Sequence, residues 1–335
     1  MRHLSSCACL LGLLSLSCAR GPAIQLARAS SPLTLQEPAV YPETLEYDAK
    51  RGQFLVGSFR QGAVYVVDDH GATTALVTDP RLCSVLGIAV DAPRDRLWAV
   101  SSDLGASVKP SSAGPKHTAA VGLYQLSSGK PLAFVDLAPL SAGPHLLNGL
   151  ALDGAGNAYV TDSFSPTIYK VDAAGAASIF LQSAQFEGDG INLNGLVVHP
   201  DGYLLVVKKS DGALFKVPLD RPSAFTRVQL ERPLLAGDGL VLVGKRTLLV
   251  IANQTPSAKS NAAISITSSD GWSNARTSAT LPLGNVYPTT AVRRDDRLYV
   301  VHSELNQLIQ APAEQKATFQ ARAVIEEIGR AAPPP

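Results

Sequence analysis

Short apolar runs recur along this chain, and each begins at a polar or small residue and ends at a polar turn. The clearest copy is residues 146–153, Leu-Leu-Asn-Gly-Leu-Ala-Leu-Asp, echoed at 192–199 by Asn-Leu-Asn-Gly-Leu-Val-Val-His. Related phrases occur at 42–48, 86–91, 237–242 and 287–292. The six copies are spaced about 50 residues apart, a period typical of a β-propeller or another strand repeat.

Each phrase is followed by further strand-like segments, such as 157–162 and 167–172 after the copy at residue 146. The first segments are almost wholly apolar, as strands buried on both faces should be, and the third segments alternate. We therefore predict an all-β fold, a six-bladed β-propeller over residues 39–330. Two polar insertions, 103–120 and 254–262, are expected to form loops on the functional face.

The ends of the chain read differently from its body. Residues 1–19 resemble a signal peptide, with Arg2 and a short apolar run before Ser17-Cys18-Ala19. This predicts an exported protein, periplasmic or extracellular, cleaved after Ala19; a lipid anchor on Cys18 is the alternative. We expect residues 20–38 to be a flexible tether and 331–335 a disordered tail.

Composition narrows the range of partners. The 335 residues are 46% hydrophobic and 17% charged, which is typical of a folded, core-rich protein. A net charge of +1 gives no indication of a nucleic-acid partner. No segment of the chain body is apolar over enough residues to predict a membrane span. Cys83 is the one cysteine after the signal segment, so we predict a core residue and no internal disulfide.

Hairpin geometry predicts which side chains share one end of the propeller. The start of a first strand and the end of a second strand lie at the same sheet edge. The residues expected around one mouth of the channel are Glu43, Leu86, Asn148, Asn194, Asp238 and Thr289 or Thr290. One layer further out we expect Ser58, Ser101, Asp162, Lys208, Asn253 and His302.

Asn-Gly and Asp-Gly pairs are also favoured hairpin turns, so turn chemistry is the alternative explanation for this set. The turns between first and second strands, however, are filled separately, for example by Asp153-Gly154 and Asp201-Gly202. The polar-glycine pair at the start of the first strand is therefore a separate feature, for which we predict a functional role.

The mouth residues suggest a cation site. Glu43 and Asp238 carry carboxylates, and Asn148 and Asn194 add amide oxygens, with no His or Cys among them. Such an all-oxygen set suits a hard cation, Ca²⁺ or Mg²⁺, with positions left open for water and a small-molecule substrate.

These phrases resemble the regucalcin/gluconolactonase (senescence-marker-protein) family, which is similar in architecture to paraoxonases and strictosidine synthases. The resemblance is carried by 41–43, 148–150, 159–163, 194–196 and 238–240 and covers roughly residues 40–305. It implies a six-bladed propeller with one calcium ion held at Glu43, Asn194 and Asp238, with Asn148 as a further ligand, and a lactonase or ester hydrolase activity. The chain departs from the family pattern at Thr44-Leu45 and in residues 103–120.

The leading hypothesis is therefore metal-dependent hydrolysis of a lactone or small ester. Asp238 is the predicted base, with His145 and His302 as further catalytic candidates. The residues expected to contact substrate are Asn148, Asp162, Lys208 and Asn253. Two alternatives remain: a calcium-stabilised binding propeller that performs no chemistry, and a lyase or bond-forming activity on the same scaffold.

Overall fold

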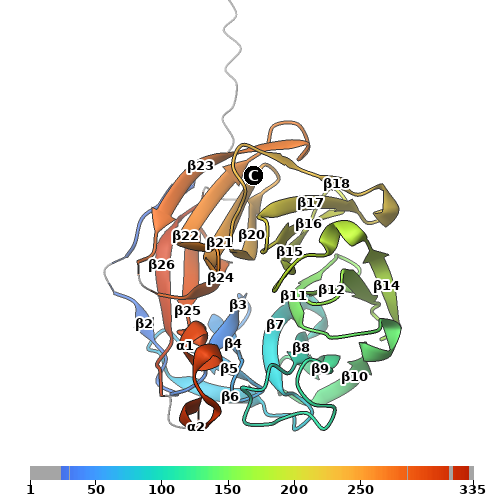
Figure 1. Cartoon of the computed structure of the whole chain (residues 1–335). Helices are drawn as coiled ribbons and strands as arrows, with labels where there is room; N and C mark the ends of the chain where they lie inside the picture. Colours follow the sequence, from blue (N-terminus) through green and yellow to red (C-terminus); the bar gives the residue numbers. More distant parts are fainter. Residues whose placement is uncertain (1–23, 30, 285, 317–319, 332–335) are drawn as a thin grey trace, which may run out of the picture.

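The computed structural model describes residues 24–29, 31–284, 286–316 and 320–331. These residues form six sheets set around a central axis (Figure 1). The predicted six-bladed β-propeller is confirmed. The predicted signal segment 1–19 lies outside the described residues.

Five blades come from consecutive stretches of chain, and each is built outward from the axis. The first four are β3 (Pro42–Asp48), β4 (Gln53–Ser58), β5 (Ala63–Val67), β6 (Thr73–Val77); β7 (Ser84–Asp91), β8 (Arg96–Ser102), β9 (Ala119–Gln125), β10 (Pro131–Asp136); β11 (Leu147–Leu152), β12 (Ala158–Asp162), β13 (Thr167–Val171), β14 (Ala177–Gln182); and β15 (Leu193–His199), β16 (Tyr203–Lys208), β17 (Ala213–Pro218), β18 (Thr226–Arg227). The fifth is β20 (Gly237–Gly244), β21 (Thr247–Thr255), β22 (Ala258–Thr267), β23 (Asn274–Pro282), with β19 (Gln229–Leu230) parallel to β23.

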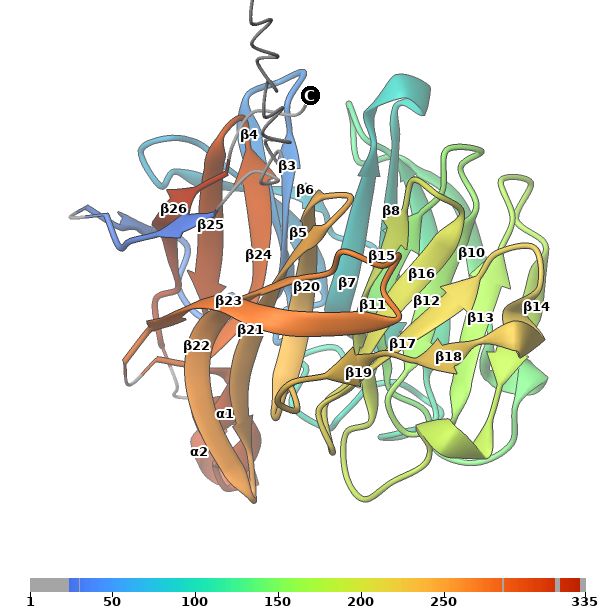
Figure 2. The same ribbon diagram turned by 90° about the horizontal axis from the view of Figure 1, so that it is seen from above.

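The last blade joins the two ends of the chain. Its strands are β24 (Pro288–Arg294), β25 (Arg297–His302) and β26 (Val324–Arg330), and β26 also pairs with β1 (Gln25–Leu26) and β2 (Leu33–Thr34). Figure 2 shows this N-terminal segment beside β26. The described part of segment 20–38 therefore belongs to the blade, and the prediction of a flexible tether is wrong for it. Two-residue strands are too short to leave a periodic pattern in the sequence.

The few helices lie in the connections. They are the 3₁₀ turns η1 (Ala92–Arg94), η2 (Ala138–Leu140), η3 (Ala184–Phe186) and η4 (Pro222–Ala224), with α1 (Leu305–Gln310) and α2 (Ala313–Lys316) after β25. None of the helices in the described ranges is long and apolar enough to cross a membrane.

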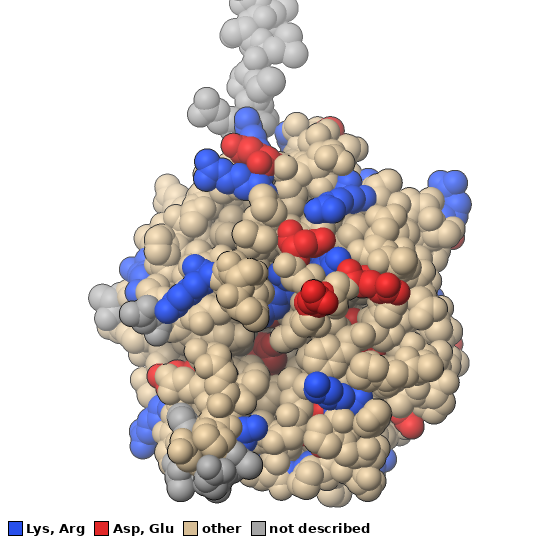
Figure 3. All heavy atoms as spheres, in the orientation of Figure 1, with Lys and Arg blue, Asp and Glu red and all other residues tan. Residues whose placement is uncertain are grey.

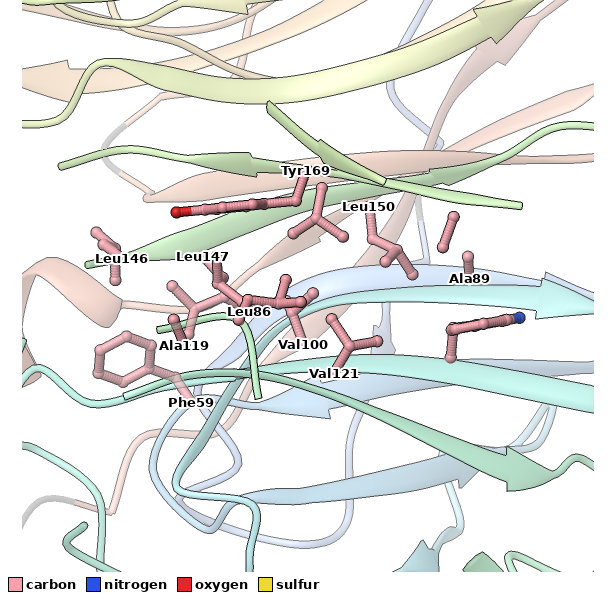
Figure 4. Close-up of a cluster of buried hydrophobic side chains, with 14 of the residues drawn as sticks. Phe59, Leu86, Ala89, Val100, Ala119, Val121, Leu146, Leu147, Leu150 and Tyr169 are labelled. Atoms are coloured by element: carbon pink, nitrogen blue, oxygen red, sulfur yellow. The ribbon is translucent and has the colours of Figure 1, made fainter. Parts of the chain in front are cut away.

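The core is divided among the interfaces between blades. Figure 4 shows one such cluster, in which Leu86 and Val100 of one blade pack near Leu150 and Tyr169 of the next. Burying each aliphatic side chain of this kind contributes about 1.5–3 kcal/mol relative to exposure. Cys83 is buried as a free thiol.

The two insertions differ from each other. Residues 103–118 form an irregular loop, which Asp103 anchors by accepting hydrogen bonds from the backbone N–H groups of Gly105 and Ser111. Residues 254–262, expected to be a loop, mostly extend the β21–β22 hairpin. At the C-terminus Ala331 is buried, and its N–H donates to the Asp296 carbonyl, so the predicted disorder is wrong for that residue. Residues 332–335 lie outside the described ranges.

Candidate functional site

Every inner strand is irregular at the same level. The pairing register with the second strand shifts between Leu147 and Leu150, and between Leu193 and Leu196. Equivalent shifts occur in β3, β7, β20 and β24. A β-bulge bends the strand and redirects side chains. Three of the six bulges coincide with the polar-glycine pairs at 148–149, 194–195 and 238–239, so these pairs lie inside strands and are not hairpin turns.

The glycines of these bulges are required by close approach of neighbouring blades. A Cβ atom on Gly149 would lie 2.5 Å from the Asn194 backbone oxygen, and one on Gly195 would lie 2.2 Å from that of Asp238. Gly87 stands in the same relation to Asn148, at 2.4 Å. The repeated glycine therefore lets these inner strands approach the next one, which brings Asn148, Asn194 and Asp238 close to neighbouring blades.

The inner strands enclose a channel of about 340 Å³. Glu43, Asn148, Asn194 and Asp238 all line it, and their exposed fractions are 8%, 5%, 3% and 1%. The structure therefore brings together the four residues predicted from the repeats; we call them the polar ring. Thr289 also lines the channel, and its hydroxyl donates to the Pro42 carbonyl of the adjacent blade.

The two carboxylates of the polar ring influence each other. Burial, and then the charge of Asp238, raise the pKa of Glu43 well above its ordinary value. Burial also raises the pKa of Asp238, against the opposing effect of the Lys209 ammonium. Unlike Asp238, Glu43 has no hydrogen bond to its carboxylate within the described part of the chain.

A lysine that the sequence analysis did not select reaches the polar ring. Lys209 Nζ lies 3.1 Å from Asp238 Oδ2, and its side chain is 4% exposed. Burial alone would lower the pKa of Lys209, but the charges of Asp238 and Glu43, and the Tyr287 side chain beside it, raise it above its ordinary value. The ring therefore contains a buried ammonium.

The amide groups complete the ring. Asn253 donates a hydrogen bond to Asp238 Oδ2 and so holds that carboxylate in place. This contact does not support the predicted role of Asn253 in substrate binding. Asn148 Nδ2 donates to Ser163 Oγ over 3.2 Å, so the amide oxygen of Asn148 is not used in that hydrogen bond. Asn194 Nδ2 is buried without a hydrogen-bond partner in the described structure. A buried unpaired amide is costly, and a bound ligand or ion would relieve it.

The donor chemistry of the ring fits a hard cation. Two carboxylates and two carboxamides offer oxygen atoms, which are the donors that hard cations prefer. The described residues contain no cluster of three or more His, Cys, Asp and Glu side chains suited to a metal. A metal at the ring would therefore depend on amide oxygens and water for part of its coordination. Lys209 reduces the formal charge of Glu43, Asp238 and Lys209 together to −1.

His145 lies away from this constellation. Its Nδ1 is 2.7 Å from Asp162 Oδ2, and its Nε2 is 3.1 Å from the Ser141 carbonyl. Both partners are acceptors, so both ring nitrogens donate, and the hydrogen bond to Asp162 raises the pKa of His145. Asp162 also accepts from backbone N–H groups, including that of Leu146. This geometry assigns both residues a structural role and argues against base catalysis by His145.

His302, the last residue of β25, contacts the neighbouring strand β26. Its Nε2 lies 2.8 Å from Glu326 Oε2, and Glu326 also receives two hydrogen bonds from Arg28. Burial lowers the pKa of His302, and its Nδ1 has no hydrogen-bond partner in the described structure. His302 therefore belongs to the closure of the last blade. Its predicted catalytic role has no support from these contacts.

Lys208 points away from the ring, although the sequence analysis selected it. Its Nζ donates to the Glu187 carbonyl over 2.6 Å and lies 3.3 Å from Asp211. Lys209, the next residue, lies just past the end of β16, and its ammonium reaches the polar ring at Asp238. In the sequence, the pair Lys208-Lys209 at the end of a predicted second strand was the feature that could have pointed to Lys209.

Charge elsewhere on the surface is mixed. Acidic and basic side chains are interspersed over the face drawn in Figure 3, in keeping with the net charge of +1. A nucleic-acid-binding surface would instead gather basic residues on one face.

Comparison with solved structures identifies the fold class. The chain is similar to the major Malassezia sympodialis allergen Mala s 1, with a TM-score of 0.70, 19% identity, and coverage of 90% of this chain and 96% of that one. A candidate gluconolactonase has a TM-score of 0.59 and 15% identity, and the match covers 92% of this chain and 99% of that one. A luciferin-regenerating enzyme has a TM-score of 0.58 and 13% identity, with coverage of 90% of this chain and 98% of that one. At these identities the likeness shows the fold, a complete six-bladed propeller.

No family model and no curated protein matches this sequence. The resemblance to the gluconolactonase family is thus supported by structural neighbours alone.

Proposed function

We propose that this protein is an exported hydrolase that opens a lactone or small ester at the polar ring. The observation that carries the proposal is the convergence of Glu43, Asn148, Asn194 and Asp238 on one channel, through six aligned bulges. A divalent cation, calcium by preference, would be held by these four side chains and would act as a Lewis acid on the substrate carbonyl.

The chain's own residues would supply orientation and proton transfer. Asn253 and Lys209 donate to Oδ2 of Asp238, and Oδ1 would accept a proton from the attacking water. Burial raises the pKa of Asp238, and this makes it a stronger base. Water adds to the carbonyl carbon, the bond to the alkoxy oxygen breaks, and the proton held by Asp238 passes to that oxygen. The product of a lactone is then the hydroxy acid.

A second candidate function is a binding propeller that performs no chemistry. Two observations favour it. The Lys209 ammonium already compensates Asp238, and both histidines proposed as bases are engaged elsewhere. Such a protein would still capture a small polar molecule through the unpaired Asn194 amide.

The deciding experiment is a screen of lactones and esters with calcium, magnesium or chelator. A hydrolase should show turnover that requires the cation and that falls at least about 10²-fold in Asp238→Asn. Asp211→Asn is the matched control, because Asp211 pairs with Lys208 outside the ring. A ligand-induced shift in melting temperature without turnover on any compound would favour the binding function.

Export is tested separately by the intact mass of the protein isolated from its source. Cleavage after Ala19 gives an unmodified chain, whereas a lipid on Cys18 adds acyl mass and retains the protein on membranes.

A further inference from the structure

We infer that Lys209 is a built-in competitor of the divalent cation, which occupies the cation's place beside Asp238 and keeps metal affinity low. This rests on the cation site of the proposed function and adds the residue that tunes it. The lysine is the one charged partner of Asp238 that the structure shows.

The first step of the argument is position. Lys209 Nζ lies 3.1 Å from Asp238 Oδ2, and the same ammonium interacts with the charge of Glu43. The ammonium therefore lies beside one carboxylate that a metal in the ring would use, and it interacts with the charge of the other. The backbone at Lys209 is held as well, because its N–H donates to the Asn192 carbonyl over 2.8 Å.

The second step is burial. Lys209 is 3% exposed, and Tyr287 lies against it with its ring centroid 5.8 Å from Nζ. A buried ammonium is stable only when paired, and two buried carboxylates are stable only with a counter-charge. Lys209 therefore supplies the counter-charge of Asp238 without any metal, and the second carboxylate, Glu43, has no ion pair in the described structure.

The third step is the effect on a bound ion. A divalent cation at the ring would meet like charge at close range, where screening by water is weak. Cation sites also lose affinity as their net negative charge falls. The wild-type ring should therefore bind calcium weakly, with a dissociation constant of about 10⁻⁴ M or higher.

The test is calorimetric titration of the mature chain with calcium chloride and with magnesium chloride. Lys209→Met keeps the length of the side chain and removes its charge, so we expect affinity to rise at least about tenfold. Lys209→Arg keeps the charge and should bind as weakly as wild type. Lys208→Met is the matched control, because Lys208 contacts Glu187 and Asp211 outside the ring.

Thermal unfolding gives a second measurement. In chelator, Lys209→Met should melt below wild type, and added calcium should restore it, whereas wild type should respond little to either. If Lys209→Met does not fold with calcium, Lys209→Gln replaces it in both measurements.

Two outcomes count against the inference in different ways. Equal calcium affinity of wild type and the uncharged variants, or a wild-type dissociation constant of about 10⁻⁶ M or tighter, overturns the competitor role and leaves the cation site standing. No binding by wild type or by the folded uncharged variants overturns the cation site of the proposed function itself.

Discussion

Glu43 and Asp238 come from opposite halves of the chain and meet in the polar ring, where the charge of Asp238 helps to raise the pKa of Glu43. Asp238 has Lys209 and Asn253 as hydrogen-bond donors, whereas Glu43 has no such donor in the described structure. Two buried carboxylates with a single ammonium between them are an unfavourable arrangement for stability alone. Strain of this kind at a site is typical of function.

Glu43→Gln should therefore stabilise the protein and remove the proposed hydrolase activity. Without a metal, loss of the repulsion should raise the free energy of unfolding by about 1–2 kcal/mol, as judged by urea denaturation in chelator. Metal-dependent turnover should fall at least about 10²-fold, because a cation ligand is lost. A variant less stable than wild type would show that Glu43 serves the fold.

The bulge glycines give a second prediction. Gly195→Ala should cost about 1–3 kcal/mol, because the added Cβ would lie 2.2 Å from the Asp238 backbone oxygen and the strands must separate. Gly154→Ala is the matched control, since nothing lies within 4 Å of its added Cβ, and its effect should stay within about 0.5 kcal/mol. Equal melting temperatures for the two variants would refute the close-approach explanation.

The repeat explains why much of this site could be predicted from the sequence. Asn148 and Asn194 stand at the same offset in two copies of one phrase, so the hairpin rule alone placed them at one mouth. Glu43 and Asp238 followed from the same offset. The ring is thus a property of the periodic pattern, which is local in the sequence and readable there.

What the sequence analysis missed depends on single contacts between distant segments. Nothing near His145 in the sequence indicates that its Nδ1 will donate to Asp162, and nothing in the N-terminal segment indicates pairing with β26. Lys209 follows the last residue of β16, where alternation within a strand no longer decides direction with certainty from sequence. Such choices are made by tertiary packing.

His145 gives a pH prediction with a definite sign. Its pKa is raised above the ordinary 6.5 in the folded protein by the hydrogen bond to Asp162. The charged histidine should therefore contribute its full stability below pH 6.5, and this contribution should be lost as the pH rises through the higher folded pKa.

The measurement is urea denaturation of wild type and His145→Gln across that pH range. The variant should be less stable by about 1–3 kcal/mol under acidic conditions, and the difference should shrink as the pH rises. A difference that grows with pH would contradict a charged His145. Because Asp162 keeps its backbone donors, including the Leu146 N–H, the variant retains the local fold.

The last prediction concerns Arg28, which ties the N-terminal segment to β26 of the last blade. Arg28 donates from Nε and one terminal nitrogen to the two oxygens of Glu326, at 2.5 and 2.9 Å, and Glu326 is buried beside His302. A paired, two-point contact of this kind is stronger than an ordinary surface ion pair. Arg28→Met should therefore lower the free energy of unfolding by about 1–2 kcal/mol and leave His302 as the hydrogen-bond partner of Glu326. Arg330→Met is the matched control: its ion pair with Asp296 is exposed and 3.4 Å long, so its loss should cost no more than about 0.5 kcal/mol. Equal losses in the two variants, measured by thermal and urea unfolding, would show that the N-terminal segment is held by its backbone pairing with β26 alone.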